Sequence, residues 1–158
     1  MFIDVASRNG VTINNPKIQN ISHFKLNVSK YHIKLIIFNL IDNAIKYSFA
    51  STKRNERSIN IVCFSQTNEL CVQVTNCGIG FLPQEISEGL IFKEGYRGQL
   101  IKDFNIKGSG SGLAIAKRVL EDQGGRIEVE SEEAEYLKIE SDPQNPYITK
   151  IKIYLPII

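Results

Sequence analysis

The sequence lacks the features that define secreted, membrane-spanning and metal-rich proteins. Its 158 residues contain no signal peptide and no apolar run of the about 20 residues that a membrane-spanning helix needs. There are only 3 cysteines, an odd number without metal-ligand spacing, so we expect free thiols in a reducing, cytoplasmic compartment. With 2 histidines, a histidine-rich metal centre is excluded. The net charge of +2 disfavours nucleic acid as the main partner.

What is present indicates one compact domain. Hydrophobic residues make up 42% of the chain and charged residues 23%. This length is enough for one core and too short for two domains. A chain of this size buries about 70% of its unfolded surface, so it needs no disulfide or metal for stability. We predict a single domain over residues 1–158, a monomer in isolation, in which residues 1–10 are the end of a preceding helix or linker.

Hydrophobic periodicity predicts a mixed α/β order. Apolar residues at three- and four-residue steps between 33 and 44 predict a helix with Ser29 as N-cap. The same spacing predicts a helix over residues 113–120 that ends at Gly124-Gly125, and a first helix is expected to end at Asn9-Gly10. Strands are predicted at residues 11–13, 24–28, 59–65, 70–75, 126–131 and 149–155, with 66–69 joining a hairpin. This order disfavours a doubly wound parallel sheet.

Three segments have no clear periodicity. Residues 51–58 are expected to form a solvated loop, and residues 132–142 are an acidic excursion between two strands. Residues 77–112 are too long for an ordinary connection, and such loops are usually functional lids or disordered. Between residues 93 and 118 there are 6 basic and 2 acidic side chains. That excess would attract a polyphosphate, although scattered surface charge is the alternative.

The helix predicted around residue 40 has a polar stripe beside its apolar face. At about 100° per residue, Asn39, Asn43 and Lys46 lie within about one sixth of its circumference. Solvated polar residues are the common explanation of such a stripe. Asparagine is a poor helix former, however, so two of them in an apolar helix suggest another role. Amide oxygens suit Mg²⁺ already paired with phosphates, and lysine supplies a positive charge.

Two glycine-rich segments complete the motifs. Asn76-Cys77-Gly78-Ile79-Gly80 follows the predicted hairpin, and its glycines permit either a close approach to a ligand or a plain tight turn. Residues 108–113, Gly-Ser-Gly-Ser-Gly-Leu, lead directly into the second helix, whose free N–H groups and dipole favour an anion. This segment matches neither a P-loop nor a dinucleotide-binding fingerprint.

Together these motifs resemble the ATP-binding domain of sensor histidine kinases, of the GHKL class. Residues 39–48 resemble its N box, 76–80 its first glycine box, 91–98 its F box, 108–113 its second glycine box, and 124–129 with 153–156 its final hairpin. The resemblance implies the Bergerat fold, an α+β two-layer sandwich in which a mixed sheet packs on about three helices. ATP would lie between a long helix and a mobile lid over residues 93–110.

The resemblance also implies a role for individual residues. Asn43 would bind Mg²⁺ with Asn39 assisting, and Lys46 would contact the phosphates. Arg97 and Lys107 would join Asn39 and Lys46 as catalytic residues that stabilise charge on the γ-phosphoryl group. The other residues expected to bind the nucleotide are Tyr47, Asn76, Gly78, Gly80, Phe92, Tyr96, Gly108, Ser109, Gly110, Ser111, Gly112 and Leu113.

The implied activity is transfer of the γ-phosphoryl group of ATP to a histidine on a separate dimerisation domain, with a response regulator receiver domain as a further partner. In gyrase-type ATPases a glutamate that activates water stands at the place of Asn39, and asparagine is no base at neutral pH, so rapid hydrolysis is disfavoured. Neither His23 nor His32 has the sequence context of the acceptor. The parent protein is expected to be cytoplasmic or anchored to a membrane through other segments.

Three positions depart from the family pattern. Asn76 replaces an aspartate that accepts a hydrogen bond from adenine, which costs about 1 kcal/mol, or about tenfold in ATP affinity, and relaxes discrimination against guanine. Cys77 replaces asparagine and is either a reactive thiol or an inert small residue. Ser111 replaces leucine and loosens the lid anchor. The alternatives are a non-catalytic nucleotide-binding or partner-docking module, a serine kinase acting on a regulatory protein, and a hydrolytic ATPase.

Overall fold

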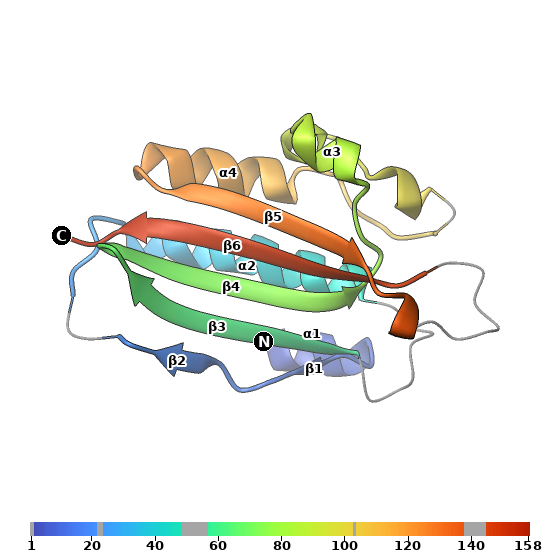
Figure 1. Cartoon of the computed structure of the whole chain (residues 1–158), viewed down its shortest axis with the longest axis horizontal. Coiled ribbons are helices and arrows are strands. Elements are labelled where there is room, and N and C mark those ends of the chain that lie inside the picture. The colour runs from blue at the N-terminus through green and yellow to red at the C-terminus, as the bar shows by residue number, and fades with distance from the viewer. Residues whose placement is uncertain (1, 22–23, 49–56, 103, 138–144) are drawn as a thin grey trace.

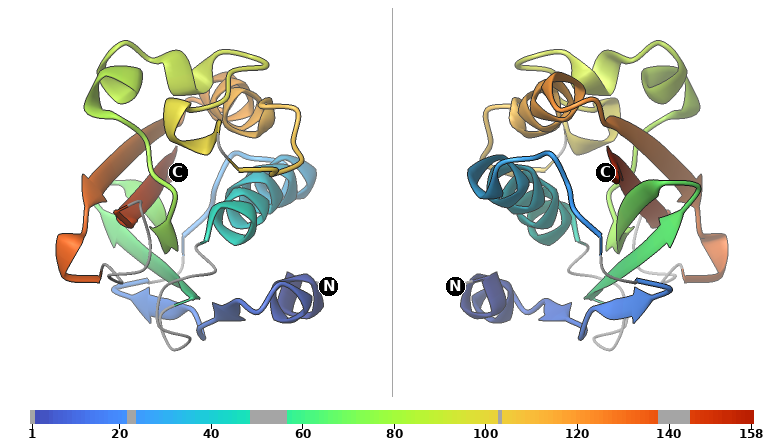
Figure 2. Two further views of the ribbon diagram at one scale, coloured as in Figure 1. Left: turned by 90° about the vertical axis from the view of Figure 1, so that its right-hand side faces the viewer. Right: turned by 90° about the vertical axis from the view of Figure 1, so that its left-hand side faces the viewer.

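The computed structural model describes residues 2–21, 24–48, 57–102, 104–137 and 145–158. The described residues form two layers, a twisted sheet and a set of helices on one of its faces (Figures 1 and 2). Most of the loop predicted at 51–58, part of the acidic excursion and His23 lie outside the described residues. None of the helices in the described ranges has the length and apolarity required to span a bilayer.

Within the described residues there are four α-helices, three 3-10 turns and six strands. The helical elements are α1 (Phe2–Arg8), α2 (Lys30–Tyr47), α3 (Pro83–Ser87), η2 (Leu90–Phe92), η3 (Gln99–Ile101), α4 (Gly112–Asp122) and η4 (Glu135–Leu137). The strands are β1 (Thr12–Ile13), β2 (Lys17–Gln19), β3 (Ser58–Gln66), β4 (Glu69–Gly78), β5 (Arg126–Glu133) and β6 (Tyr147–Pro156).

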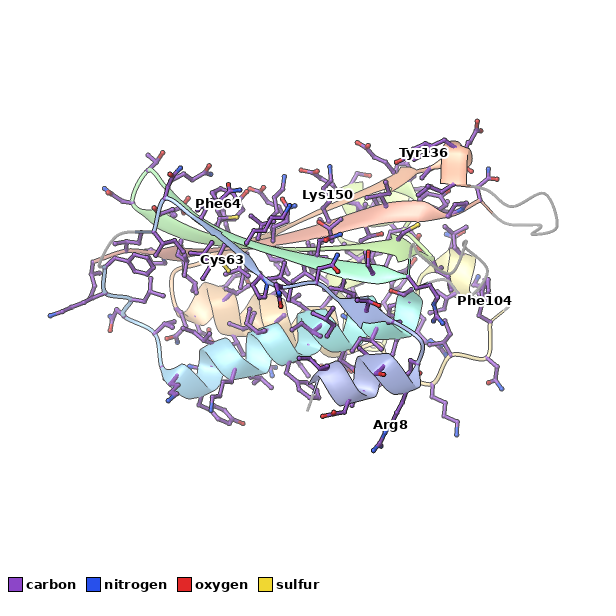
Figure 3. All side chains as sticks on the ribbon, turned by 90° about the horizontal axis from the view of Figure 1, so that it is seen from below. Arg8, Cys63, Phe64, Phe104, Tyr136 and Lys150 are labelled. Carbon is purple, nitrogen blue, oxygen red and sulfur yellow. The ribbon has the colours of Figure 1, made fainter. Side chains whose placement is uncertain are left out.

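The sheet is mixed, with the strand order β1-β3-β4-β6-β5 and β2 paired beside β1 on β3. The β3–β4, β4–β6 and β6–β5 pairs are antiparallel, whereas β1 and β2 run parallel to β3. One row of cross-strand partners, Ile61–Val74–Ile151–Val129, belongs to the core under the helices. Because side chains alternate between faces, Phe64 and Lys150 lie on the opposite face of the sheet (Figure 3).

Helices α2 and α4 pack on the sheet through the apolar faces that the sequence predicts. The N–H of His32 donates to the Ser29 hydroxyl at 3.1 Å, which caps the start of α2. The buried residues of these two helices are Ile36, Leu40, Ile41, Ala44 and Ile45 in α2, and Leu113, Ala116 and Leu120 in α4. Gly124, with a φ of +71°, follows the end of α4. The fold class, both amphipathic helices and the hairpin of β3 and β4 are therefore confirmed.

Two expectations about the elements are wrong. Residues 24–28 form no strand, and only an isolated bridge joins Leu26 to Ile157. The second strand of this region is instead β2, whose three residues are all exposed, so no apolar alternation marks it. Residues 77–112 are not a single loop, because they contain α3 and the turns η2 and η3. Elements this short give too few residues for a hydrophobic period.

Candidate functional site

A cleft of about 730 Å³ opens where α2 ends and α4 begins. Its other walls come from residues 79–81, 91, 96–98, 101 and 108–110. All these segments meet at the same end of the molecule, which is the right-hand end in Figure 1.

The cleft collects most of the residues that the sequence predicts for the site. Those that line it are Asn39, Asn43, Lys46, Tyr47, Gly80, Tyr96, Arg97, Gly108, Ser109, Gly110, Gly112 and Leu113. The cleft is also lined by residues to which the sequence analysis gave no individual role: Asp42, Ile79, Phe81, Ile91, Gly98 and Ile101. Four of these six are apolar or aromatic, so nothing distinguishes them in the sequence from core residues.

The polar stripe of α2 faces the first residue of α4. A Cβ atom built on Gly112 would lie 3.2 Å from both side-chain polar atoms of Asn43 and 3.4 Å from Oδ1 of Asn39. The Asn39 amide donates to the carbonyl oxygen of Leu35 at 2.9 Å, which leaves its oxygen on the side of Gly112. Glycine therefore permits the two asparagines to lie directly against the beginning of α4.

The N-terminus of α4 has no side-chain cap. Its N-cap residue Ser111 makes no side-chain hydrogen bond to the helix, and the first backbone bond back to the cap comes from the N–H of Ile115 at 2.9 Å. The N–H groups before Ile115 have no partner within the helix. Together with the helix dipole, they form a local site for an anion beside the two asparagine amides.

A smaller recess of about 280 Å³ adjoins the cleft and has Asn76 in its lining. The Asn76 side chain is only 5% exposed and makes no hydrogen bond to another described residue. Leu113 and Ile151 contribute apolar walls, and Thr149 lies beside them. An apolar recess with one unpaired amide at its side suits a flat heteroaromatic ring that presents donor and acceptor groups.

Hydroxyl groups hold the wall of the recess that contains Phe81 and Thr149. Ser131 Oγ lies 3.0 Å from the Thr149 hydroxyl and accepts a hydrogen bond of 3.0 Å from the N–H of Phe81. A Cβ atom on Gly80 would lie 2.3 Å from the ring of Tyr147. The segment that leaves β4 therefore lies tightly against the β5–β6 hairpin, and only glycine fits at position 80.

Positive charge gathers at the mouth of the cleft. The Lys46 ammonium pairs with Asp42 at 2.5 Å, and the Arg97 guanidinium donates to the carbonyl oxygen of Ile106 at 2.5 Å. Burial raises the pKa of Tyr47, while Arg97 and Lys46 act in the opposite direction. Both cations therefore act electrostatically on the Tyr47 hydroxyl, so a phosphate chain in this cleft would lie within their field.

Five residues that the sequence marks do not line the cleft or the recess. A Cβ on Gly78 would lie 1.9 Å from the carbonyl oxygen of Tyr47, so this glycine joins β4 to the end of α2. Phe92 faces the core, and the Lys117 ammonium lies 4.8 Å from its ring centroid. Cys77 is half-buried, Lys107 is exposed and Ser111 is the N-cap of α4. None of the three cysteines forms a disulfide in the described part of the chain, as predicted.

Sequence reasoning missed one buried charged residue beside the site. Glu85 in α3 is fully buried and accepts three hydrogen bonds: from the N–H of Leu82 at 2.7 Å, from the Tyr96 hydroxyl at 2.7 Å and from the N–H of Gln99 at 2.8 Å. A signal for α3 was present, because Pro83 followed two residues later by glutamate is typical of a helix start. The contact to Tyr96 is long-range and has no sequence signal.

The comparisons with known proteins agree with this geometry. Residues 29–157 match the family described as "Histidine kinase-, DNA gyrase B-, and HSP90-like ATPase". The chain is 32% identical over 101 residues to Sensor protein RprX of Bacteroides fragilis, covering 64% of this chain and 18% of that protein. It is 29% identical over 111 residues to the signal transduction histidine-protein kinase ArlS of Staphylococcus haemolyticus, covering 70% of this chain and 23% of that protein. The chain thus spans less than a quarter of these relatives.

Solved structures show the same fold. The mycobacterial sensor histidine kinase MprB superposes with a TM-score of 0.69 at 22% identity, over 99% of this chain and 93% of that chain. The catalytic domain of the histidine kinase ThkA superposes with a TM-score of 0.61 at 19% identity, over 98% of this chain and 84% of that chain. The fold of this chain is therefore a known one.

Proposed function

The chain belongs to the family of histidine kinase-, DNA gyrase B- and HSP90-like ATPases, and from this premise we propose that it binds Mg–ATP for transfer of the γ-phosphoryl group to a histidine. The observation that supports this most directly is the juxtaposition of Asn39 and Asn43 with the uncapped start of α4. Free helix N–H groups bind phosphate oxygens, and amide oxygens beside them suit a phosphate-bound cation.

The adenine ring is assigned to the recess and the phosphates to the cleft. Asn76 has a free amide in the recess, so its oxygen can accept from an exocyclic amino group. The segment Gly108–Gly112 passes from the cleft wall into α4, where its backbone N–H groups would surround the phosphates. We propose residues 93–110 as the ATP lid, because its residues 96–98, 101 and 108–110 line the cleft together with α2.

The donors around Asn43 fit Mg²⁺ that arrives with the nucleotide. No cluster of three or more histidine, cysteine or acidic residues is found in the described part of the chain, so it offers no all-protein metal cage. Asp42 is paired with Lys46. Mg²⁺ keeps waters and substrate phosphates as ligands and needs few protein oxygens, and the Asn43 and Asn39 amides supply them. Bound there, the cation would neutralise charge on the phosphates.

The catalytic contribution of this chain would be positioning and charge. Lys46, Arg97 and Lys107 are our candidates for stabilising the charge that spreads over the γ-phosphoryl oxygens during transfer. Asn39 holds the place at the cleft where a hydrolytic enzyme of the family needs a base, and an amide accepts no proton at neutral pH. We therefore propose that the nucleophile is a histidine of a separate dimerisation domain, with a receiver domain as the later acceptor.

The test of this function has a binding step and a transfer step. Isothermal titration of the chain with AMP-PNP is expected to show binding that EDTA weakens. The chain is then supplied with the histidine-bearing dimerisation domain of its parent protein, Mg²⁺ and γ-labelled ATP, and acid-labile phosphate on histidine is measured. Binding without label in the presence of that domain would contradict the kinase, and absence of both would contradict nucleotide binding as well.

A second candidate function follows from Asn76. A neutral amide in place of a carboxylate weakens the bond to the base, which favours a non-catalytic module that binds nucleotide poorly and docks partners. The two candidates differ in the titration above. A dissociation constant near millimolar with no phosphotransfer supports the docking module, whereas micromolar binding supports the kinase.

A further inference from the structure

Glu85 is a buried carboxylate that the proposed chemistry does not use. Its side chain is fully buried, and in the described part of the chain no basic side chain pairs with it. Burial of an unpaired carboxylate is costly unless hydrogen bonds replace water. Three donors do so here, from three separate places in the chain: Leu82, Tyr96 and Gln99.

These donors belong to the framework of the cleft. Leu82 follows the wall residue Phe81, whose own N–H is held by Ser131. Tyr96 lines the cleft, and Gln99 begins η3 directly after the lining residue Gly98. The Glu85 carboxylate therefore connects the segment at residues 81–82 to the segment at residues 96–99, on two walls of the cleft.

The connection continues from Tyr96 to the glycine segment that enters α4. A Cβ atom on Gly110 would lie 2.5 Å from the carbonyl oxygen of Tyr96, so the two backbones are in close contact. Gly110 has a φ of +73°, a conformation that side chains disfavour. The position of Tyr96 thus determines where the segment 108–112 lies. The hydrogen bond to Glu85 also raises the pKa of the Tyr96 hydroxyl, so Tyr96 remains the donor.

We infer that Glu85 is a positioning residue that fixes the phosphate-binding segment 108–112 through Tyr96, and this inference rests on the proposed function. Only an acceptor without hydrogens suits the site, because all three neighbours donate. Glutamine keeps the shape but presents an NH₂ group, so it opposes at least one of these donors. The segment 108–112, which would hold the phosphates, is therefore fixed by the Glu85 carboxylate, which does not contact them.

The test compares ATP with adenosine, using the whole chain, Mg²⁺ and calorimetry. Glu85→Gln and Tyr96→Phe are expected to weaken ATP binding about tenfold each, because each loses a hydrogen bond to a buried charge. In Tyr96→Phe, adenosine affinity is expected to change less than about twofold, since neither Tyr96 nor the segment 108–112 lines the recess. Glu88→Gln is the matched control, because Glu88 is exposed near the end of α3 and bonds only to Gln84 among described side chains.

Amide hydrogen exchange without nucleotide provides a second measurement. This measurement uses Tyr96→Phe, because this variant leaves the buried carboxylate in place and serves if Glu85→Gln fails to fold. Amide exchange is expected to accelerate at residues 96–99 and 108–112 and to stay unchanged in the β-sheet. An equal loss of ATP and adenosine affinity in Tyr96→Phe, or wild-type ATP affinity in both variants, would overturn the inference and leave the proposed function standing. If the unmodified chain binds no ATP, the proposed function fails, and the inference fails with it.

Discussion

Asn76 is the residue whose side-chain chemistry most affects the choice between ATP and GTP. It is buried at the side of the recess and has no hydrogen-bond partner among described residues, so its two polar groups are available to a base. A carboxylate only accepts, whereas an amide also donates. An adenine amino group needs an acceptor, and a guanine carbonyl at the equivalent place needs a donor. Asn76 can satisfy either by rotation about its last bond.

We predict that Asn76→Asp raises ATP affinity about tenfold and sharpens the preference for ATP over GTP, because the bond to the base becomes charge-assisted. Competitive titration of both nucleotides against a fluorescent analogue measures this. The wild-type chain is expected to bind the two with similar affinity. A strong ATP preference in the wild type would contradict the relaxed discrimination, and an unchanged affinity in the variant would remove Asn76 from the base site.

Single residues divide into those that sequence motifs identify and those that only the fold brings together. Asn43 and Gly112 belong to local patterns, so the helical spacing and the glycine run predict them. Thr149 and Glu85 come from a strand and a short helix without such a pattern, and they reach the site through pairing across the sheet and through long-range hydrogen bonds. A single sequence has no signal for contacts of that range.

At the scale of elements, a substitution in the first turn of α4 is expected to affect ligand binding without lowering the stability of the fold. Alanine is the better helix former, by about 1 kcal/mol in a helix interior, so Gly112→Ala is expected to leave the melting temperature unchanged or higher. Its new Cβ would lie 3.2 Å from the Asn43 amide, which must then move. We predict at least about a tenfold loss of Mg–ATP affinity by calorimetry. The exposed Glu121→Ala, at the other end of α4, is the control.

If Gly112→Ala binds Mg–ATP as the wild type does, the contact between Asn43 and α4 has no part in the site. A loss of both stability and affinity would instead indicate that glycine is needed for the helix start itself. Only the combination of a retained melting temperature and reduced affinity supports the assignment.

The β5–β6 hairpin predicts a pH dependence of stability. The Lys152 ammonium donates to Glu130 at 2.5 Å, with Lys150 3.8 Å away. This hydrogen bond lowers the pKa of Glu130 and raises that of Lys152. Because the folded pKa of Glu130 is below the usual 4.5, the pair stabilises the fold above that pH and loses its effect as pH falls through the folded pKa. On the alkaline side, the effect is lost as pH rises through the raised pKa of Lys152.

We therefore predict that Glu130→Gln lowers the free energy of unfolding at pH 7 by less than about 1 kcal/mol, since both side chains of the pair remain partly exposed to solvent. At about pH 2 the variant and the wild type are expected to have equal stability. Urea denaturation at both pH values measures the difference. Glu132→Gln on the same strand is the control, and a difference that persists at the acid pH would exclude the ion pair as its cause.

Element prediction succeeded where one face of the element is buried. Helices α2 and α4 bury apolar residues at helical spacing, and β4 and β6 alternate between the core and the outer face, so both periods are present in the sequence. β2 pairs with β3 through its backbone and exposes all three residues. Helix α3 has five residues and depends on Glu85 for its first turn. Backbone pairing and short helices leave no hydrophobic period.

In the whole molecule, the core and the site share one helix. Adjacent faces of α2 present Leu40, which is fully buried under the sheet, and the amides of Asn39 and Asn43, which line the cleft. The sheet and α4 pack against the face that carries Leu40. The beginning of α4 also lies against the face that carries Asn39 and Asn43. The site is therefore built when the layers pack, and no separate scaffold is needed to position it.

This sharing leads to a prediction that separates folding from ligand binding. Leu40→Ala removes a core side chain and is expected to destabilise the fold by about 2–5 kcal/mol, while Mg–ATP should still raise its melting temperature. Asn43→Ala replaces a half-buried polar residue with a better helix former, so the melting temperature without ligand should hold. The increment on adding Mg–ATP, about 2.7 kcal/mol at a hundredfold excess over the dissociation constant, should be lost. Thermal melts of both variants with and without Mg–ATP measure the two effects, and an increment retained in Asn43→Ala would exclude this asparagine from the ligand site.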